Sequence, residues 1–146
     1  MNKPFNFLEQ RVKRSIERER ALEHHFDAAS RSLWPWQESK LLLLVSLVAM
    51  LDYISTYAFL ELSGNSRVFE AGPLAAWAFH TGGFTRLFWV DVAAVSTLII
   101  LASTAQFLYG KFGFRGFGRT AFVFALIPYA VITMAIIFNN IVLTFI

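Results

Sequence analysis

The chain has 146 residues, of which 56% are hydrophobic and 16% are charged, and its formal net charge is +3. Soluble globular domains have about 45–50% apolar and about 25% charged residues, so the composition indicates a membrane protein with one domain. The absence of cysteine excludes disulfide bonds, thiolate metal sites and a cysteine nucleophile.

Residues 1–39 are expected to form a charged amphipathic helix on the cytoplasmic side, with helical periodicity over residues 5–33. The apolar positions that recur at steps of three or four are Leu8, Val12, Ile16, Leu22, Phe26, Ala29 and Leu33. Acids and bases alternate on the other faces, which excludes a cleavable signal peptide. The helix either packs on its own membrane domain or a partner, or lies flat on anionic lipid, and its mixed charge favours packing.

Three apolar segments predict membrane spans over residues 41–60, 87–108 and 120–146. Pro35 should end the N-terminal helix, and Trp34 and Trp36 beside it suit the headgroup level of a bilayer. Between the first two spans, Pro73 suits an early position of a short helix over about residues 72–81. This helix is too short to cross a bilayer and is therefore interfacial or re-entrant.

Basic residues predict the orientation of the spans. Eight of the thirteen Lys and Arg residues precede Leu41, and three more lie between residues 111 and 119. The N-terminus and the 110–119 loop should therefore be cytoplasmic, and the first loop and C-terminus should lie outside. Lys111, Arg115 and Arg119 should face anionic lipid. The Arg, Gly and Phe residues of this loop do not predict nucleic-acid binding, because the loop is short and tied to the membrane at both ends.

Polar residues of the spans gather in the outer half of the expected membrane domain. Asp52, Ser55 and Thr56 stand at positions i, i+3 and i+4, so they share one helix face. Asp52 lies about 12 Å from the outer end of its span, and Asp91 about 6 Å below the same surface. The full candidate cluster is Asp52, Ser55, Thr56, Glu70, Pro73, His80 and Asp91.

Three interpretations of this cluster remain open. The first is structural, with Asp52 bonded to the short helix, Glu70 capping that helix and Asp91 paired with an arginine such as Arg86. The second is a site for a cation or a polar ligand. The third is proton or hydrolytic chemistry, although the chain contains no phosphate-binding loop, nucleophile elbow or HExxH motif. Ser55 and Thr56 are better suited to hydrogen bonds between helices than to nucleophilic attack. We therefore expect no catalytic residues, metal site or cofactor.

The motifs around this cluster resemble those of an uncharacterised family of small bacterial and archaeal multi-pass membrane proteins. The resemblance covers roughly residues 43–105 and depends on residues 51–56, Gly64, residues 70–74 and residues 82–84. That family has an Asp-x-x-x-Thr run in its first span and a Glu-x-Asn-Pro motif after it. The resemblance implies the membrane architecture and the importance of Asp52, Thr56, Glu70 and Pro73, but no reaction.

The chain departs from the family pattern at two positions. Gly72 stands where the family usually has Asn, and Asp91 lies near the position where a Lys often begins the next span. A carboxylate–ammonium pair at that position therefore cannot form in this chain.

Together these patterns predict an all-α integral protein of the cell membrane, the inner membrane in a bacterium. We expect an accessory or structural subunit of a larger membrane complex, without enzymatic activity, in contact with the bilayer and with other membrane subunits or copies of itself. The first alternative is an ion- or small-ligand-binding protein, such as a transporter component, that uses the outer-half carboxylates. The second is a membrane-embedded enzyme.

Overall fold

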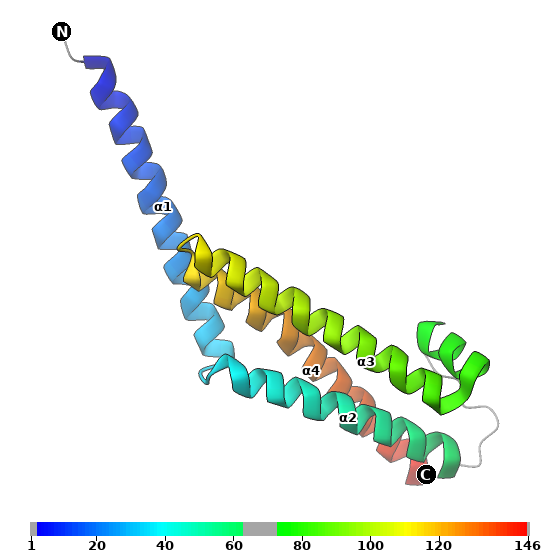
Figure 1. Cartoon of the computed structure of the whole chain (residues 1–146). Helices are drawn as coiled ribbons and strands as arrows, with labels where there is room; N and C mark the ends of the chain where they lie inside the picture. The colour runs from blue at the N-terminus through cyan, green and yellow to red at the C-terminus, as the bar shows by residue number, and fades with distance from the viewer. Residues whose placement is uncertain (1–2, 63–72, 146) are drawn as a thin grey trace.

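A computed structural model describes residues 3–62 and 73–145, all of them in or between four helices. These helices are α1 (Lys3–Leu33), α2 (Glu38–Leu62), α3 (Pro73–Lys111) and α4 (Arg115–Phe145) (Figure 1). Three of them, α2, α3 and α4, are long and apolar enough to cross a membrane. The all-α class is therefore confirmed, and each of the three predicted spans corresponds to a helix that could cross a membrane.

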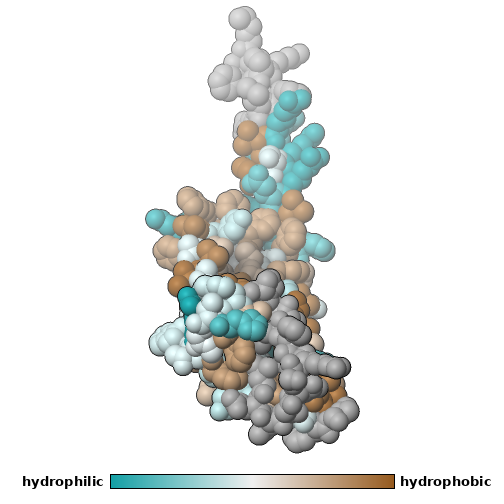
Figure 2. Space-filling view, turned by 90° about the vertical axis from the view of Figure 1, so that its right-hand side faces the viewer, coloured by the Kyte–Doolittle hydropathy of each residue, from teal (hydrophilic) through white to brown (hydrophobic). Residues whose placement is uncertain are grey.

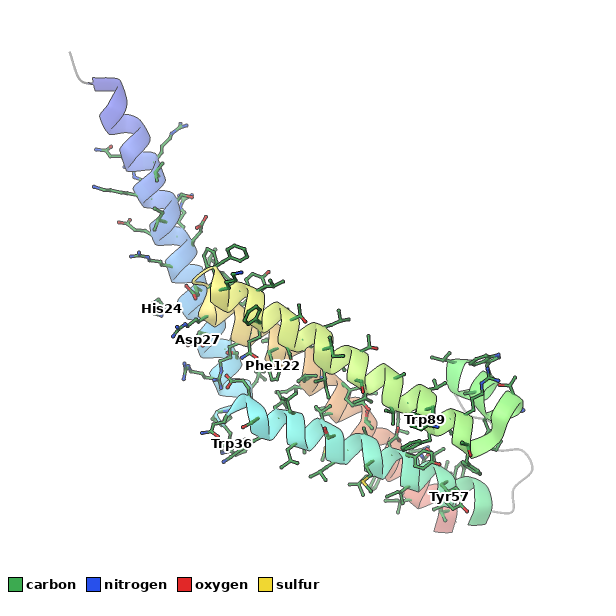
Figure 3. All side chains as sticks on the ribbon, in the orientation of Figure 1. His24, Asp27, Trp36, Tyr57, Trp89 and Phe122 are labelled. Atoms are coloured by element: carbon green, nitrogen blue, oxygen red, sulfur yellow. The ribbon has the colours of Figure 1, made fainter. Side chains whose placement is uncertain are left out.

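Helix α4 is the central helix of the bundle, because it packs against each of the other three helices, whereas α2 and α3 touch each other far less. The buried core lies in the half of the bundle nearer α1 and consists of Leu41, Val45, Ala102, Phe122, Val123, Leu126 and Ala130. Phe122 is the largest of the fully buried side chains and lies in this half, while Tyr57 lies toward the opposite end (Figure 3). The small side chains of Ala102 and Ala130 let neighbouring helices approach α4 closely.

The outward faces of α2, α3 and α4 are apolar along their length. Large side chains that are more than half exposed include Met50 on α2, Phe107 on α3 and Phe138 on α4. A soluble protein rarely exposes such a continuous apolar surface. These faces therefore suit contact with lipid or with other membrane helices.

Gly83 divides α3 into two helical segments. Its φ of 61° and ψ of −155° fall in a region of backbone conformation that is essentially open only to glycine. The segment before Gly83 corresponds to the predicted short helix over residues 72–81, and the segment after it contains the predicted second span. An interfacial or re-entrant position for the segment before Gly83 stays a prediction.

Helix α1 extends beyond the bundle (Figure 1). Its C-terminal part packs against α4, where Ser30 is fully buried, and its N-terminal part points away from the other helices. Figure 2 shows hydrophilic side chains along one side of the projecting part and hydrophobic ones along the other. Of the two interpretations of the N-terminal helix, packing against its own membrane domain describes the C-terminal part of α1.

Candidate functional site

Two polar groups of residues lie in different halves of the bundle. One is inside the predicted spans, and we call it the intramembrane cluster (Asp52, Ser55, Thr56, Asp91, Tyr129 and Asn140). The other is at the end where α1 joins the bundle, and we call it the junction. Its cleft is lined by Glu23, His24, Asp27, Arg31, Glu38, Gln106, Gly110, Arg115, Gly116 and Arg119.

Asn140 connects α4 to α2 in the intramembrane cluster. Its Nδ2 donates to Ser55 Oγ at 3.3 Å and to Thr56 Oγ1 at 3.1 Å, and all three residues are buried. Ser55 Oγ in turn donates to the Asp52 carbonyl at 3.0 Å. These bonds satisfy neutral polar groups inside the spans, so Ser55 and Thr56 join two helices in this structure.

The two predicted carboxylates, Asp52 and Asp91, come from different helices and share one neighbour. Both side chains are partly buried, Asp52 on α2 and Asp91 on α3. Tyr129 on α4 lies within electrostatic reach of both carboxyl groups. Helices α2, α3 and α4 thus each contribute one titratable side chain to this part of the bundle.

The remaining predicted site residues lie apart from this arrangement or outside the described residues. His80 is exposed on the segment before Gly83, Pro73 is the first residue of α3, and Glu70 falls outside the described residues. Arg86, considered as a partner for Asp91, has its guanidinium carbon 4.4 Å from the centre of the Trp77 ring. Among the described residues, no three His, Cys, Asp or Glu side chains gather in a way that could hold a metal ion.

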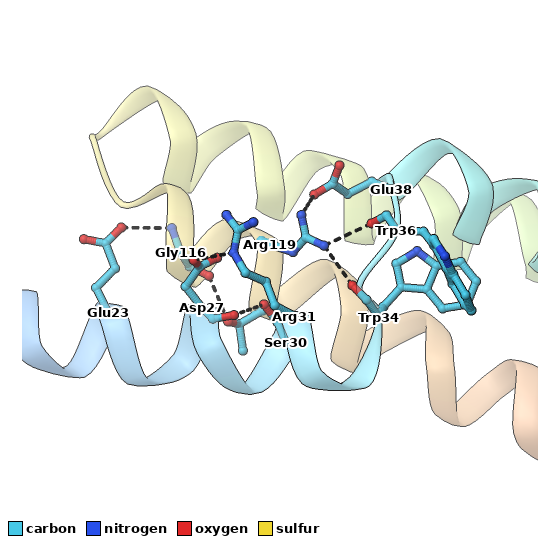
Figure 4. A network of polar contacts seen from close by, with 10 residues as sticks. Glu23, Asp27, Ser30, Arg31, Trp34, Trp36, Glu38, Gly116 and Arg119 are labelled. Carbon is cyan, nitrogen blue, oxygen red and sulfur yellow. Dashed lines mark hydrogen bonds and ion pairs between the residues drawn. The ribbon is translucent and has the colours of Figure 1, made fainter.

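Arg119 is the centre of the junction (Figure 4). Its Nη1 donates to Glu38 Oε1 at 2.6 Å, and its Nη2 donates to the carbonyl oxygens of Trp34 at 2.8 Å and Trp36 at 3.1 Å. Carbonyls at the end of a helix have no partner within it, so Arg119 satisfies groups that the end of α1 leaves open. One side chain thus joins the first turn of α4 to the end of α1 and the first turn of α2.

This position of Arg119 differs from the lipid-facing one expected from the sequence. Its side chain is only 13% exposed, and its hydrogen bonds go to protein atoms. Three of the other expected anchors are exposed, namely Trp36, Lys111 and Arg115. Trp34 is partly buried, and its Nε1 donates to the Gln37 carbonyl at 3.0 Å. Their contact with lipid stays a prediction.

Glu23 and Gly116 bring α1 into close contact with the start of α4. The Gly116 N–H donates to Glu23 Oε1 at 2.9 Å, as suits a carboxylate at a helix N-terminus. A Cβ on Gly116 would lie 2.8 Å from Glu23 Cγ and 3.0 Å from the Glu23 carbonyl oxygen. Only glycine therefore allows the two backbones to approach this closely.

Asp27 and Arg31 form the third polar pair of the junction. Arg31 Nε donates to Asp27 Oδ2 at 2.8 Å, one helical turn along α1. This hydrogen bond, with the negative charge of Asp27, raises the pKa of Arg31, so the guanidinium keeps its charge at every physiological pH. Helices α1 to α4 all contribute to the cleft around these pairs, which has a volume of about 520 Å³.

The sequence did not predict the junction as a site. A signal was present, because Glu23, Asp27 and Arg31 follow one another at steps of four and share one face of α1. Gly116, the partner of Glu23, lies 93 residues later in the chain, and Arg119 lies 85 residues after Trp34, whose carbonyl it binds. Nothing in the sequence pairs either residue with this end of α1.

Comparison with protein-family models, curated proteins and solved structures finds no match to this chain. The family resemblance of residues 43–105 therefore stays a prediction.

Proposed function

We propose that this protein is a small accessory subunit of a larger membrane complex, without enzymatic activity, and that α1 is the arm that binds its partner. The observation that carries the proposal is the projection of α1 beyond the bundle with apolar side chains exposed along it.

The exposed apolar residues of α1 extend over both its projecting and its packed parts. Val12 is 57% exposed and Ile16 44%, in the part that points away from the bundle. Leu22, Phe26 and Leu33 follow with exposures of 39% to 52%. An amphipathic helix gains most of its stability by burying its apolar face, so these side chains favour a partner that covers them.

The junction makes α1 suitable as an arm. Arg119 bonds to two carbonyls of the α1–α2 turn, and Glu23 fixes α1 to the first turn of α4. A helix held at one end by several polar bonds loses less freedom when it binds a partner than a tethered flexible segment would. The acids and bases on its other faces suit a polar partner surface better than an anionic lipid surface.

The same proposal includes the orientation of the protein in the cell membrane. Helix α1 and the turn between α3 and α4 lie at one end of the bundle, and the C-terminus lies at the other (Figure 1). The basic residues of α1 and of this turn support a cytoplasmic position for that end, with the C-terminus outside and the segment before Gly83 at the outer surface.

The test is the mass and composition of the complex extracted from native membranes in mild detergent. The full-length protein should migrate with a larger assembly at fixed stoichiometry. Joint substitution of Val12→Glu and Ile16→Glu should release it, because a buried charge opposes docking of the apolar face. The matched control is Ala21→Glu with Ala28→Glu, which adds the same charge at exposed positions on the opposite side of α1. Migration as a lone homo-oligomer would contradict the proposal.

A second candidate function is binding of an ion or a small polar ligand in the outer half of the bundle. Two partly buried carboxylates, Asp52 and Asp91, lie within electrostatic reach of Tyr129 and favour it, because a carboxylate within a membrane span commonly marks a functional site. Ligand-dependent thermal stabilisation that disappears in Asp52→Asn would support this candidate. Unchanged folding and binding in Asp52→Asn would exclude it.

A further inference from the structure

The carboxylates and the arginines of the junction cleft differ in how far their hydrogen-bonding groups are already engaged. Three arginines and three carboxylates line it, so their charges balance in number. Each carboxylate already has a partner: Glu23 accepts from the Gly116 N–H, Asp27 from Arg31, and Glu38 from Arg119. Carboxylates engaged in this way are poor sites for a further cation.

The arginines, in contrast, keep unused donors. Among the described residues, no hydrogen bond or ion pair holds the Arg115 guanidinium, and Arg31 uses only its Nε. Arg119 differs from these two, because its Nη atoms bond to Glu38 and to the α1–α2 turn, and its Nε is buried without a hydrogen-bond acceptor among the described residues. Each guanidinium offers five N–H donors in a plane that matches the oxygens of a phosphate group. The unused hydrogen-bonding groups of the cleft are thus donors, so they favour an anion as the ligand.

The position of the cleft in the bundle restricts which anion can reach it. Glu38 and Arg119 lie at the starts of α2 and α4, next to Trp34 and Trp36, at the end where apolar side chains give way to charged ones. This is the depth at which a bilayer presents the phosphates of its lipids. The volume of about 520 Å³ is within the range of small-ligand sites.

We infer that the junction cleft binds a phosphate group through Arg31 and Arg115, and that this phosphate belongs to the headgroup of a phospholipid. Arg119 and Glu38 hold the walls of the cleft together, while Arg31 and Arg115 reach the ligand from α1 and from the start of α4. The lipid would fill the space between α1 and the bundle and stiffen the attachment of the arm. This inference does not depend on the identity of any protein partner.

The test is native mass spectrometry of the full-length, delipidated protein in mild detergent, titrated with dioctanoyl phosphatidylglycerol. We expect one saturable lipid, and dioctanoylglycerol, which has the same chains without phosphate, should bind far more weakly. Joint Arg31→Gln and Arg115→Gln should weaken binding of phosphatidylglycerol by about tenfold or more. The fold should persist, because the Arg31–Asp27 pair is exposed and Arg115 makes no bond within the described residues.

Two further measurements decide whether the phosphate comes from a lipid and whether it binds in the junction cleft. Lys111→Gln removes a charge from an exposed residue at the same end but outside the cleft, and it should leave the affinity within about twofold. Inorganic phosphate that binds as tightly as phosphatidylglycerol would support the phosphate site but assign it to a soluble compound. Equal binding of dioctanoylglycerol, or unchanged affinity in the double arginine variant, would overturn the inference.

Discussion

Arg119 and Glu38 form an ion pair of 2.6 Å between the first turn of α4 and the first turn of α2. The same guanidinium binds two carbonyls of the turn between α1 and α2, so one side chain fixes three helices at one end of the bundle. The attachment of α1 to the membrane domain therefore depends on few residues, and each of them can be tested.

Arg119→Gln should lower the free energy of unfolding by about 1–3 kcal/mol, because it removes the charge from a largely buried pair and leaves carbonyls without donors. The free energy of unfolding of Arg119→Lys should lie between those of the wild type and Arg119→Gln, since an ammonium group keeps the charge but cannot reproduce the fork of N–H donors of a guanidinium. Reversible unfolding in detergent measures the effect, with Lys111→Gln as the control. Equal stability of Arg119→Gln and the control would show that the pair contributes nothing.

Gly116→Ala should loosen α1 from the bundle at a cost of about 1–3 kcal/mol, because the new methyl group would overlap Glu23. Hydrogen exchange of the α1 amides should increase around Glu23 and Ser30. Gly110→Ala is the matched control, since a Cβ there meets nothing within 4 Å. If both variants exchange alike, the close approach of α1 and α4 is not a constraint.

Asn140→Leu should destabilise the bundle modestly, by about 0.6 kcal/mol and at most about 1.7 kcal/mol, as is usual for hydrogen bonds between membrane helices. Asn139→Leu changes the neighbouring residue, which is exposed, and should have no such effect. The comparison is made by the midpoint of unfolding in mixed detergent. A larger loss in Asn139→Leu than in Asn140→Leu would contradict the observed orientation of α4.

Gly83→Ala should cost about 1–3 kcal/mol or straighten α3, because the backbone conformation at this position excludes a side chain. The Tyr57–Phe84 and Tyr53–Phe88 ring contacts, with centroids 4.7 Å and 5.2 Å apart, lie directly beside the kink. Near-ultraviolet circular dichroism of these aromatic residues should therefore change. An unaltered spectrum and stability would mean that the kink is not required.

The helices and their breaks were predictable because they depend on local sequence. Length and hydropathy alone predicted three spans, which correspond to three helices long and apolar enough to cross a membrane. The Gly82-Gly83 pair was predicted to end the short helix before the second span, and α3 is interrupted at Gly83. Spacing also placed Ser55 and Thr56 on one face of α2, but not their contact with Asn140. That contact depends on α4 lying between α2 and α3, which is decided by packing and not by periodicity.

The junction was missed for a related reason. A basic residue next to an apolar span is typical of an interface anchor, and Arg119 has this pattern. Its partner Glu38 lies 81 residues earlier in the chain. Only the three-dimensional arrangement shows that the two side chains meet, and that the arginine is largely buried.

The most direct test of α1 as a partner-binding arm is photo-crosslinking in native membranes. A photoreactive amino acid is placed at Ile16, on the exposed apolar side of α1, or at Ala21, on its opposite side. The account predicts one discrete adduct with a different protein from position 16 and none from position 21. Adducts with lipid only, with a second copy of this chain, or equally from both positions would contradict it.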